Sequence, residues 1–189
     1  MSDTTTAPAA ADAATQAALE RLNTVIDRLI APDGCPWDST QTPESLTEYV
    51  IEECHELVDA IRSGKTADMV EELGDVAFLI LMIGKLMARA GGPSLADALE
   101  VEAAKMVRRH PHVFSDTTSE NQSEQLKDWD RIKREEKAAA DAEGPKGTYD
   151  SLPRGLPPLT KAYRIHSKAD RVGFTWPENE DVEKQVEAE

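Results

Sequence analysis

Two acidic clusters lie in the middle of the chain, and each interrupts a segment that otherwise has the apolar periodicity of a helix. They occupy residues 52–56 (EECHE) and 71–75 (EELGD). Carboxylates on the apolar side of a helix are costly unless a cation meets them. Two such groups on neighbouring helices would form an oxygen-rich cage suited to Mg²⁺, with Mn²⁺ as the alternative ion.

Helical geometry separates these acids from one another. A step of about 100° per residue puts Glu53 close to the direction of Leu46, within the apolar stripe of its helix. Glu52 and Glu71 each lie one step off a stripe, so Glu52 stays a candidate for catalysis and Glu71 is assigned to the surface. The acids on or beside apolar faces form two i,i+3 pairs, and they are Glu53, Glu56, Glu72 and Asp75.

Two other interpretations of the clusters stay open at this point. Acidic residues are common on helix surfaces and occur in such pairs by chance. Glu52-x-x-His55 also matches one element of a ferritin-like di-iron bundle, but that design needs a second Glu-x-x-His on another helix. The second cluster has Asp75 and no histidine, so an all-oxygen site for Mg²⁺ or Mn²⁺ is favoured.

Residues 105–114 (KMVRRHPHVF) are the most basic stretch of an acidic chain. Lys105 and Arg109 share a helix face, and Arg108 lies beside them. These cations either complement the dipole of a helix C-terminus or bind phosphates. Next to an oxygen metal cage, phosphate binding is favoured.

Trp129 and Lys133 share a face of a strongly charged segment. One interpretation is an exposed indole ring that stacks on a nucleobase. The alternative is that the segment docks on the core through Trp129 and Ile132. Trp129 and Lys133 are therefore candidates for substrate binding.

Composition and charge restrict the class of protein. The 189 residues are 40% apolar and only 5% aromatic, and β-type alternation is scarce, which favours an all-α fold. A formal net charge of −15 argues against nucleic-acid binding through a broad basic surface. No apolar run is long enough to span a membrane, no signal peptide is visible, and two cysteines form no disulfide framework. These features predict a soluble cytoplasmic protein.

The periodicity predicts six helices. Residues 1–15 are expected to be a disordered tail, and residues 144–158 a connector rich in proline and glycine, before a C-terminal helical segment at 159–189. Thr42 and Ser94 are expected to cap the second and fourth helices, and Gly64 to end the second. The predicted helices cover residues 16–30, 43–63, 66–90, 94–110, 124–143 and 159–172.

Taken together, these residues resemble the MazG-type nucleoside triphosphate pyrophosphohydrolases. The metal motif is Glu52-Glu53-x-x-Glu56, followed after fifteen residues by Glu72-x-x-Asp75. The resemblance runs from about residue 19 to residue 176, and its further strings are at 34–38 (GCPWD), 41–42 (QT), 105–114, 152–153 (LP) and 171–176 (RVGFTW).

The resemblance implies a helical bundle in which paired helices form a four-helix active-site unit, completed or stabilised in a homodimer. Residues 16–143 would be the catalytic domain. The implied activity is Mg²⁺-dependent hydrolysis of nucleoside triphosphates to monophosphate and pyrophosphate, for nucleotide-pool house-cleaning or stress control. The four paired acids match the family's metal ligands, Glu52 its remaining acid, Lys105 and Arg109 its phosphate contacts, and Trp129 a position near the nucleotide.

The chain departs from the long members of this family, which carry two copies of the catalytic domain. Only one full acidic motif is present here. Glu52 or Glu53 is expected to orient the attacking water or take its proton. The alternatives are a non-catalytic nucleotide-binding or regulatory helical dimer, and a purely structural helical dimer.

Overall fold

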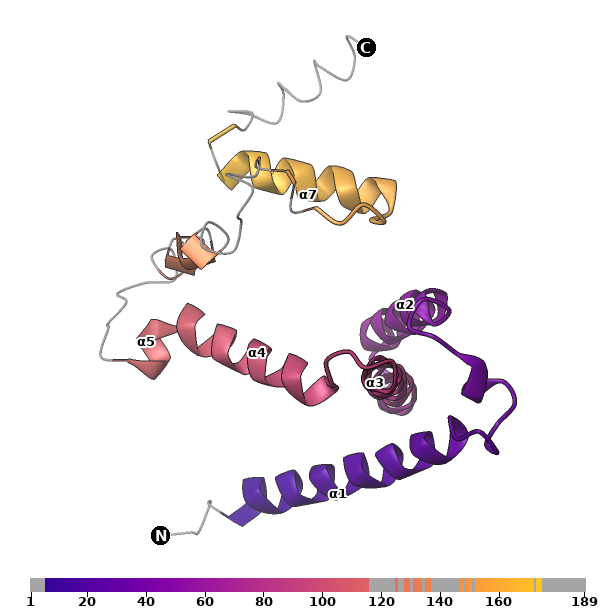
Figure 1. Ribbon diagram of the computed structural model, residues 1–189. Helices are drawn as coiled ribbons and strands as arrows, with labels where there is room; N and C mark the ends of the chain where they lie inside the picture. The colour runs from indigo at the N-terminus through magenta and orange to yellow at the C-terminus, as the bar shows by residue number, and fades with distance from the viewer. Residues whose placement is uncertain are drawn as a thin grey trace. The chain divides into compact units, whose positions relative to one another are not determined.

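The computed structural model describes residues 6–115, 125, 128–129, 131–133, 135–136, 147, 149–150, 152–171 and 173–174. These residues form helices and turns and contain no strand, which confirms the all-α prediction for this part of the chain (Figure 1). They belong to two compact units, Met1–Arg108 and Arg109–Glu189. None of the described helices is both long and apolar enough to cross a membrane.

Helix α1 (Thr6–Leu29) begins ten residues before the predicted start at Gln16. Residues 6–15, which were assigned to a disordered tail, are therefore helical. They are rich in alanine, the strongest helix former, and residues 11–16 are exposed. The helix extends here because of helix propensity and not because of burial. A search for apolar periodicity cannot detect such an extension.

A short irregular segment follows α1 and contains the helix η1 (Asp38–Thr40). The second helix was predicted from Pro43, but α2 (Thr47–Ser63) begins four residues later. Thr42 and Ser45 exchange hydrogen bonds in both directions, at 3.0 and 3.2 Å, as a capping pair does, but residues 43–46 form a turn before the helix begins. This turn places the fully buried Leu46 in the core.

Helices α2 and α3 (Thr66–Arg89) pack against each other as a helical hairpin (Figure 1). Two residues, Gly64 and Lys65, connect them. Gly64 has φ 70°, in the left-handed region that glycine adopts without strain, and its N–H donates to the carbonyl of Ile61. The predicted stop at Gly64 is confirmed, and so short a turn makes the helices antiparallel neighbours.

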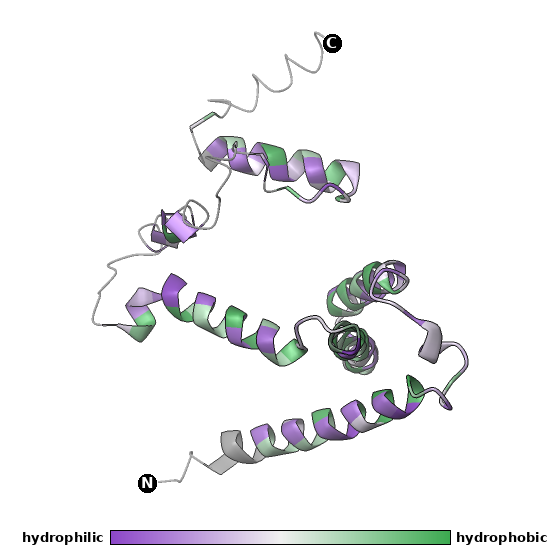
Figure 2. Ribbon diagram, in the orientation of Figure 1, coloured by the Kyte–Doolittle hydropathy of each residue, from purple (hydrophilic) through white to green (hydrophobic). Residues whose placement is uncertain are grey.

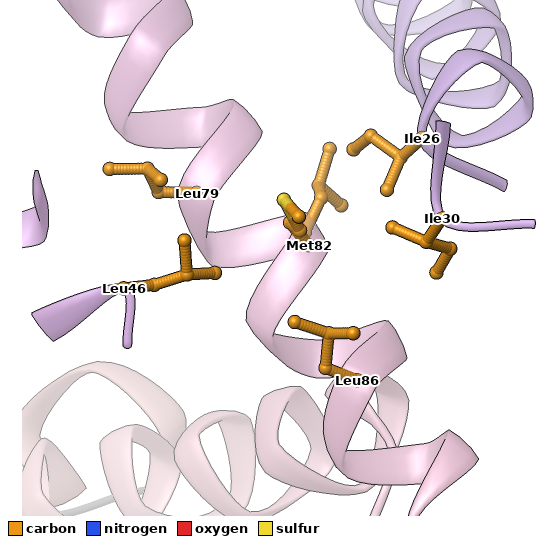
Figure 3. Close-up of a cluster of buried hydrophobic side chains, with 7 residues drawn as sticks. Ile26, Ile30, Leu46, Leu79, Met82 and Leu86 are labelled. Atoms are coloured by element: carbon orange, nitrogen blue, oxygen red, sulfur yellow. The ribbon is translucent and has the colours of Figure 1, made fainter. Parts of the chain in front are cut away.

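The core of the first unit lies where α1, the turn at Leu46 and α3 meet (Figure 3). Met82 is completely buried at its centre, and Ile26 of α1 is buried beside it. Partly buried side chains of α2 and α4 also pack against this core. The buried members of the cluster are Ile26, Ile30, Leu46, Leu79, Leu81, Met82 and Leu86.

Helix α4 (Leu95–Arg109) carries hydrophobic and hydrophilic residues along its length (Figure 2). The predicted cap is confirmed: the N–H of Asp97 donates to Ser94 Oγ at 3.3 Å, and the N–H of Ser94 donates to the Asp97 carboxylate at 2.8 Å. The start of α4 lies very close to α3, since a Cβ added at Gly84 would stand 2.7 Å from Leu95 Cβ. Glycine at 84 permits this approach.

The second unit contains α5 (Pro111–Phe114) and α7 (Pro158–Arg171). No helix was predicted where α5 lies, because four residues are too few to show periodicity. The described residues of the predicted helix 124–143 are helical, and α7 agrees with the predicted 159–172 within one residue at each end. The predictions for residues 1–5 and 175–189, and for most of 137–151, lie outside the described residues.

Candidate active site

Three of the four predicted metal ligands come together on the α2–α3 hairpin. Glu53, Glu56 and Glu72 each offer a carboxylate oxygen, and these three oxygens lie within 4.8 Å of one another. Glu53 and Glu72 are partly buried, whereas Glu56 is exposed. The group opens to solvent and can receive a ligand from outside.

The spacing of these acids around the turn explains why they meet. Glu56 and Glu72 each lie eight residues from Gly64, and Glu53 and Asp75 each lie eleven residues from it. In an antiparallel hairpin with a rise of about 1.5 Å per residue, residues at equal distances from the turn stand at the same level. The two i,i+3 pairs therefore face each other level by level.

The carboxylates of this group repel one another, and this repulsion changes the pKa of Glu53 and of Glu72. Partial burial raises the pKa of Glu53, and repulsion from Asp75, Glu56 and Glu52 raises it further. The pKa of Glu72 is raised by the same causes, with Glu56 and Glu53 its strongest repelling neighbours. A divalent cation would relieve this repulsion.

Asp75 stands beside the three converging glutamates without being one of them. It is exposed, yet it is the strongest repelling neighbour of Glu53. That effect agrees with its position level with Glu53 across the hairpin. Its role as a fourth ligand stays a prediction.

The donor set fits a hard divalent cation. The converging groups are carboxylates only, whose oxygens suit Mg²⁺ and Mn²⁺. His55, which entered the di-iron alternative, is exposed and is not one of the three converging groups. Glu52 and Glu71 are exposed as well, and the burial that was expected to make the acids costly is only partial.

The predicted phosphate-binding residues lie in two places. Lys105, in α4, is half-buried and forms an ion pair with Glu102 one turn earlier. Arg109 belongs to the second unit and donates to Glu136. Arg108 is exposed and Lys133 half-buried. The binding roles of these four residues stay predictions.

Of the two interpretations of Trp129, the exposed ring does not agree with the structure, because the residue is partly buried. The guanidinium carbon of Arg109 lies 5.3 Å from the centre of the indole ring. The His110 ring meets the indole edge-on at 5.0 Å. Stacking of Trp129 on a nucleobase stays a prediction that must accommodate these two neighbours.

Sequence reasoning missed two acids that pair with the basic residues. Glu102 lies three residues before Lys105, and this i,i+3 spacing was a usable signal. Glu136 lies 27 residues after Arg109, and local periodicity cannot show such a pairing.

Comparison with known proteins agrees with this arrangement. A family model described as the MazG nucleotide pyrophosphohydrolase domain matches residues 41–114. The Escherichia coli K12 protein named nucleoside triphosphate pyrophosphohydrolase is 38% identical over 159 residues, which are 84% of this chain and 59% of that protein. The Thermotoga maritima protein named nucleoside triphosphate pyrophosphohydrolase/pyrophosphatase MazG is 36% identical over 170 residues, 90% of this chain and 64% of that protein.

A solved structure agrees too. The crystal structure of a mazG-related protein from Thermotoga maritima superposes with a TM-score of 0.53 at 29% identity, covering 60% of this chain and 97% of that one. The chain spans about three-fifths of the length of the two curated relatives. The converging glutamates all lie inside residues 41–114, the part of the chain that matches the MazG nucleotide pyrophosphohydrolase domain.

Proposed function

We propose that this chain hydrolyses nucleoside triphosphates to nucleoside monophosphate and pyrophosphate with Mg²⁺ as cofactor. The observation that carries the proposal is the convergence of Glu53, Glu56 and Glu72 oxygens within 4.8 Å in the part of the chain that matches the MazG domain. Displacement of pyrophosphate by water at the α-phosphorus is limited by charge and alignment. Carboxylates that hold a cation and basic residues that bind the phosphates would balance this charge and align the reacting groups.

The residues of the chain take separate roles in this proposal. Glu53, Glu56, Glu72 and Asp75 hold Mg²⁺, with Mn²⁺ as a substitute. When bound, the ion polarises the phosphate and lowers the pKa of water. Glu53 or the neighbouring Glu52 orients the attacking water and accepts its proton.

The basic residues and the tryptophan complete the proposed substrate site. Lys105 and Arg109 neutralise the charge that develops on the leaving pyrophosphate, with Arg108 and Lys133 as further contacts. Trp129 lies near the nucleotide. The proposed physiological role, house-cleaning of the nucleotide pool or control of that pool in stress, rests on the family.

The proposed assay follows product formation by the full chain. Pyrophosphate and monophosphate are measured over a panel of ordinary and damaged nucleoside triphosphates, with and without Mg²⁺. Glu53→Gln and Glu72→Gln should each lower kcat by about a hundredfold or more, as loss of one transition-state-stabilising group does. Glu48→Gln, an exposed acid in the first turn of α2, is the matched control and should keep wild-type activity.

The assay also distinguishes the alternative function. Wild-type activity in Glu53→Gln or Glu72→Gln would refute the assigned site. Calorimetric binding of nucleotide with Mg²⁺ but without any product would instead favour a nucleotide-binding or regulatory module. Absence of any response to Mg²⁺ and nucleotide would favour a purely structural helical dimer.

We further propose that the chain acts as a homodimer in which two α2–α3 hairpins form a four-helix unit. Exposed apolar side chains recur at heptad spacing along α3, at Leu73, Ile80 and Met87, with exposed fractions of 60%, 49% and 39%. Ile51 and Val58 have the same spacing on α2 and are exposed too. Helices in four-helix units bury such stripes against one another.

Sedimentation equilibrium tests the dimer. Ile80→Glu should give a monomer, whereas Val25→Glu on α1, a comparably exposed valine at 52%, should leave the association state unchanged. A monomeric wild-type chain would refute the proposed dimer. We place the enzyme in the cytoplasm, and the free thiols of Cys35 and Cys54 support a reducing compartment.

A further inference from the structure

Arg109 is held by an acid to which no role has been given so far. Its Nε and Nη2 atoms both donate to Glu136 Oε2, at 2.9 and 2.7 Å. The side chains are only 14% and 22% exposed. A charge-assisted pair with this little solvent around it holds its geometry far better than a surface ion pair does.

The aromatic rings beside this pair restrict the guanidinium further. Trp129 lies on one face of it, with the guanidinium carbon 5.3 Å from the ring centre. The Trp129 ring is itself met edge-on by His110. One edge and one face of the Arg109 guanidinium are therefore fixed by the protein.

The other edge of the guanidinium is left for a ligand. Arginine has five N–H donors in a planar fork, and the hydrogen bonds described for Arg109 use Nε and Nη2 only. The remaining edge, formed by Nη1 and the second Nη2 hydrogen, matches two oxygens of a phosphate. Arginine, unlike lysine, can bind one acid and one phosphate at the same time in this way.

We propose that Glu136 is a positioning residue for phosphate recognition: it fixes Arg109 through the Nε edge so that the Nη1 edge receives a phosphate of the nucleotide. The inference rests on the proposed function, because that function supplies the nucleotide. Glu136 acts through Arg109 and touches no substrate. The opposite role, in which Glu136 occupies Arg109 and must be displaced by phosphate, predicts effects of opposite sign.

Binding of inorganic tripolyphosphate to the full chain, measured by calorimetry with Mg²⁺ present, tests the inference without requiring turnover. Arg109→Ala should weaken binding about tenfold, the loss expected for a hydrogen bond to a charged group. Glu136→Ala should weaken binding about three- to tenfold, whereas Glu136→Gln, which keeps an acceptor oxygen, should restore most of it. Glu135→Ala is the matched control, since Glu135 is exposed and pairs with Arg131 at 3.1 Å.

The double variant Arg109→Ala/Glu136→Ala shows whether Glu136 acts through Arg109. If it does, the double variant binds tripolyphosphate no more weakly than Arg109→Ala alone. Additive losses would overturn the inference. So would tighter binding by Glu136→Ala, because that is the result expected if Glu136 blocks the arginine.

A measurement on the wild-type chain remains decisive if Glu136→Ala does not fold. In nitrogen-15 spectra of the arginine side chains, the Nε–H signal of Arg109 should keep its position on addition of tripolyphosphate while the Nη signals shift. Movement of the Nε–H signal would show that Glu136 is displaced. If the chain hydrolyses nucleotides and Glu136→Ala does so as fast as Glu135→Ala, this inference alone is refuted. If the effects of Arg109→Ala and Glu136→Ala on tripolyphosphate binding are non-additive as expected but no nucleotide is hydrolysed, the proposed function alone is refuted.

Discussion

Replacing Gly84 by alanine should fail to stabilise the chain even though alanine is the better helix former. Gly84 lies inside α3, and the added Cβ would stand 2.7 Å from Leu95 Cβ. Carbon atoms in ordinary contact are about 3.5–4.0 Å apart, so Leu95 would have to move by about 1 Å. Leu95 packs against the core at the start of α4, and no flexible side-chain end is available to give way.

Gly74, in the same helix, is the matched control. A Cβ added there meets nothing within 4 Å, and the residue is exposed. Each Gly→Ala change gains about 1 kcal/mol of helix propensity, which cancels in the comparison of the two variants. The overpacking at Gly84 costs about 1–3 kcal/mol. The free energy of unfolding should therefore be about 1–3 kcal/mol lower for Gly84→Ala than for Gly74→Ala.

Urea unfolding in buffer without divalent cations measures this difference. The midpoint should move up for Gly74→Ala relative to wild type. For Gly84→Ala it should lie below that of Gly74→Ala with the same denaturant slope. Equal stabilisation by the two substitutions would refute the reasoning, because it would mean that α4 does not begin against Gly84.

Three further predictions concern the carboxylates and the cap of α4. Glu72→Gln removes one of the three carboxylates within 4.8 Å, so it should raise the melting temperature in cation-free buffer. It should also reduce the increase in melting temperature that Mg²⁺ causes. Differential scanning fluorimetry should show neither change for Glu48→Gln. Since burial and neighbouring acids raise the folded-state pKa of Glu53 and Glu72 above 4.5, the folded chain binds these protons more tightly than the unfolded chain. Their contribution to stability should thus fall as pH rises from 4.5 through the folded-state pKa values. The free energy of unfolding, measured in EDTA, should therefore depend less on pH over this range in the Glu53→Gln/Glu72→Gln variant than in the wild type. The same pH dependence in both would contradict the raised pKa values. Ser94→Ala should cost about 1 kcal/mol of stability and raise the pKa of Asp97, which hydrogen bonds from Ser94 lower; carbon-13 titration of the Asp97 carboxyl checks this, and an unchanged pKa would exclude the hydrogen bond.

The parts of the fold that follow local rules could be predicted from the sequence. Gly64 ends α2 because only a left-handed residue closes the turn there, and Ser94 with Asp97 caps α4. The start of α2 was missed because residues 43–46 form a turn and Leu46 is buried in the core, although Thr42 and Ser45 exchange the hydrogen bonds of a helix cap. Such tertiary preferences do not appear in local periodicity.

Some contacts of the candidate site could likewise be predicted from the sequence, and others could not. The acids on α2 and α3 were found because helical spacing puts them on one face, and a two-residue turn brings those faces together. The surroundings of Arg109 were not found, because Glu136 and Trp129 reach it from another helix. The two-residue connection, which makes α2 and α3 neighbours, is therefore what made the contacts between the acids predictable.

The short turn at Gly64 has a consequence for how the three carboxylates come together when the chain folds. All three converging glutamates lie within residues 53–72, on two helices joined by two residues. Closing so short a loop costs little chain entropy, and local contacts form early in folding. One contiguous stretch of the chain thus supplies all three oxygens, and an insertion outside residues 47–89 does not separate them in sequence.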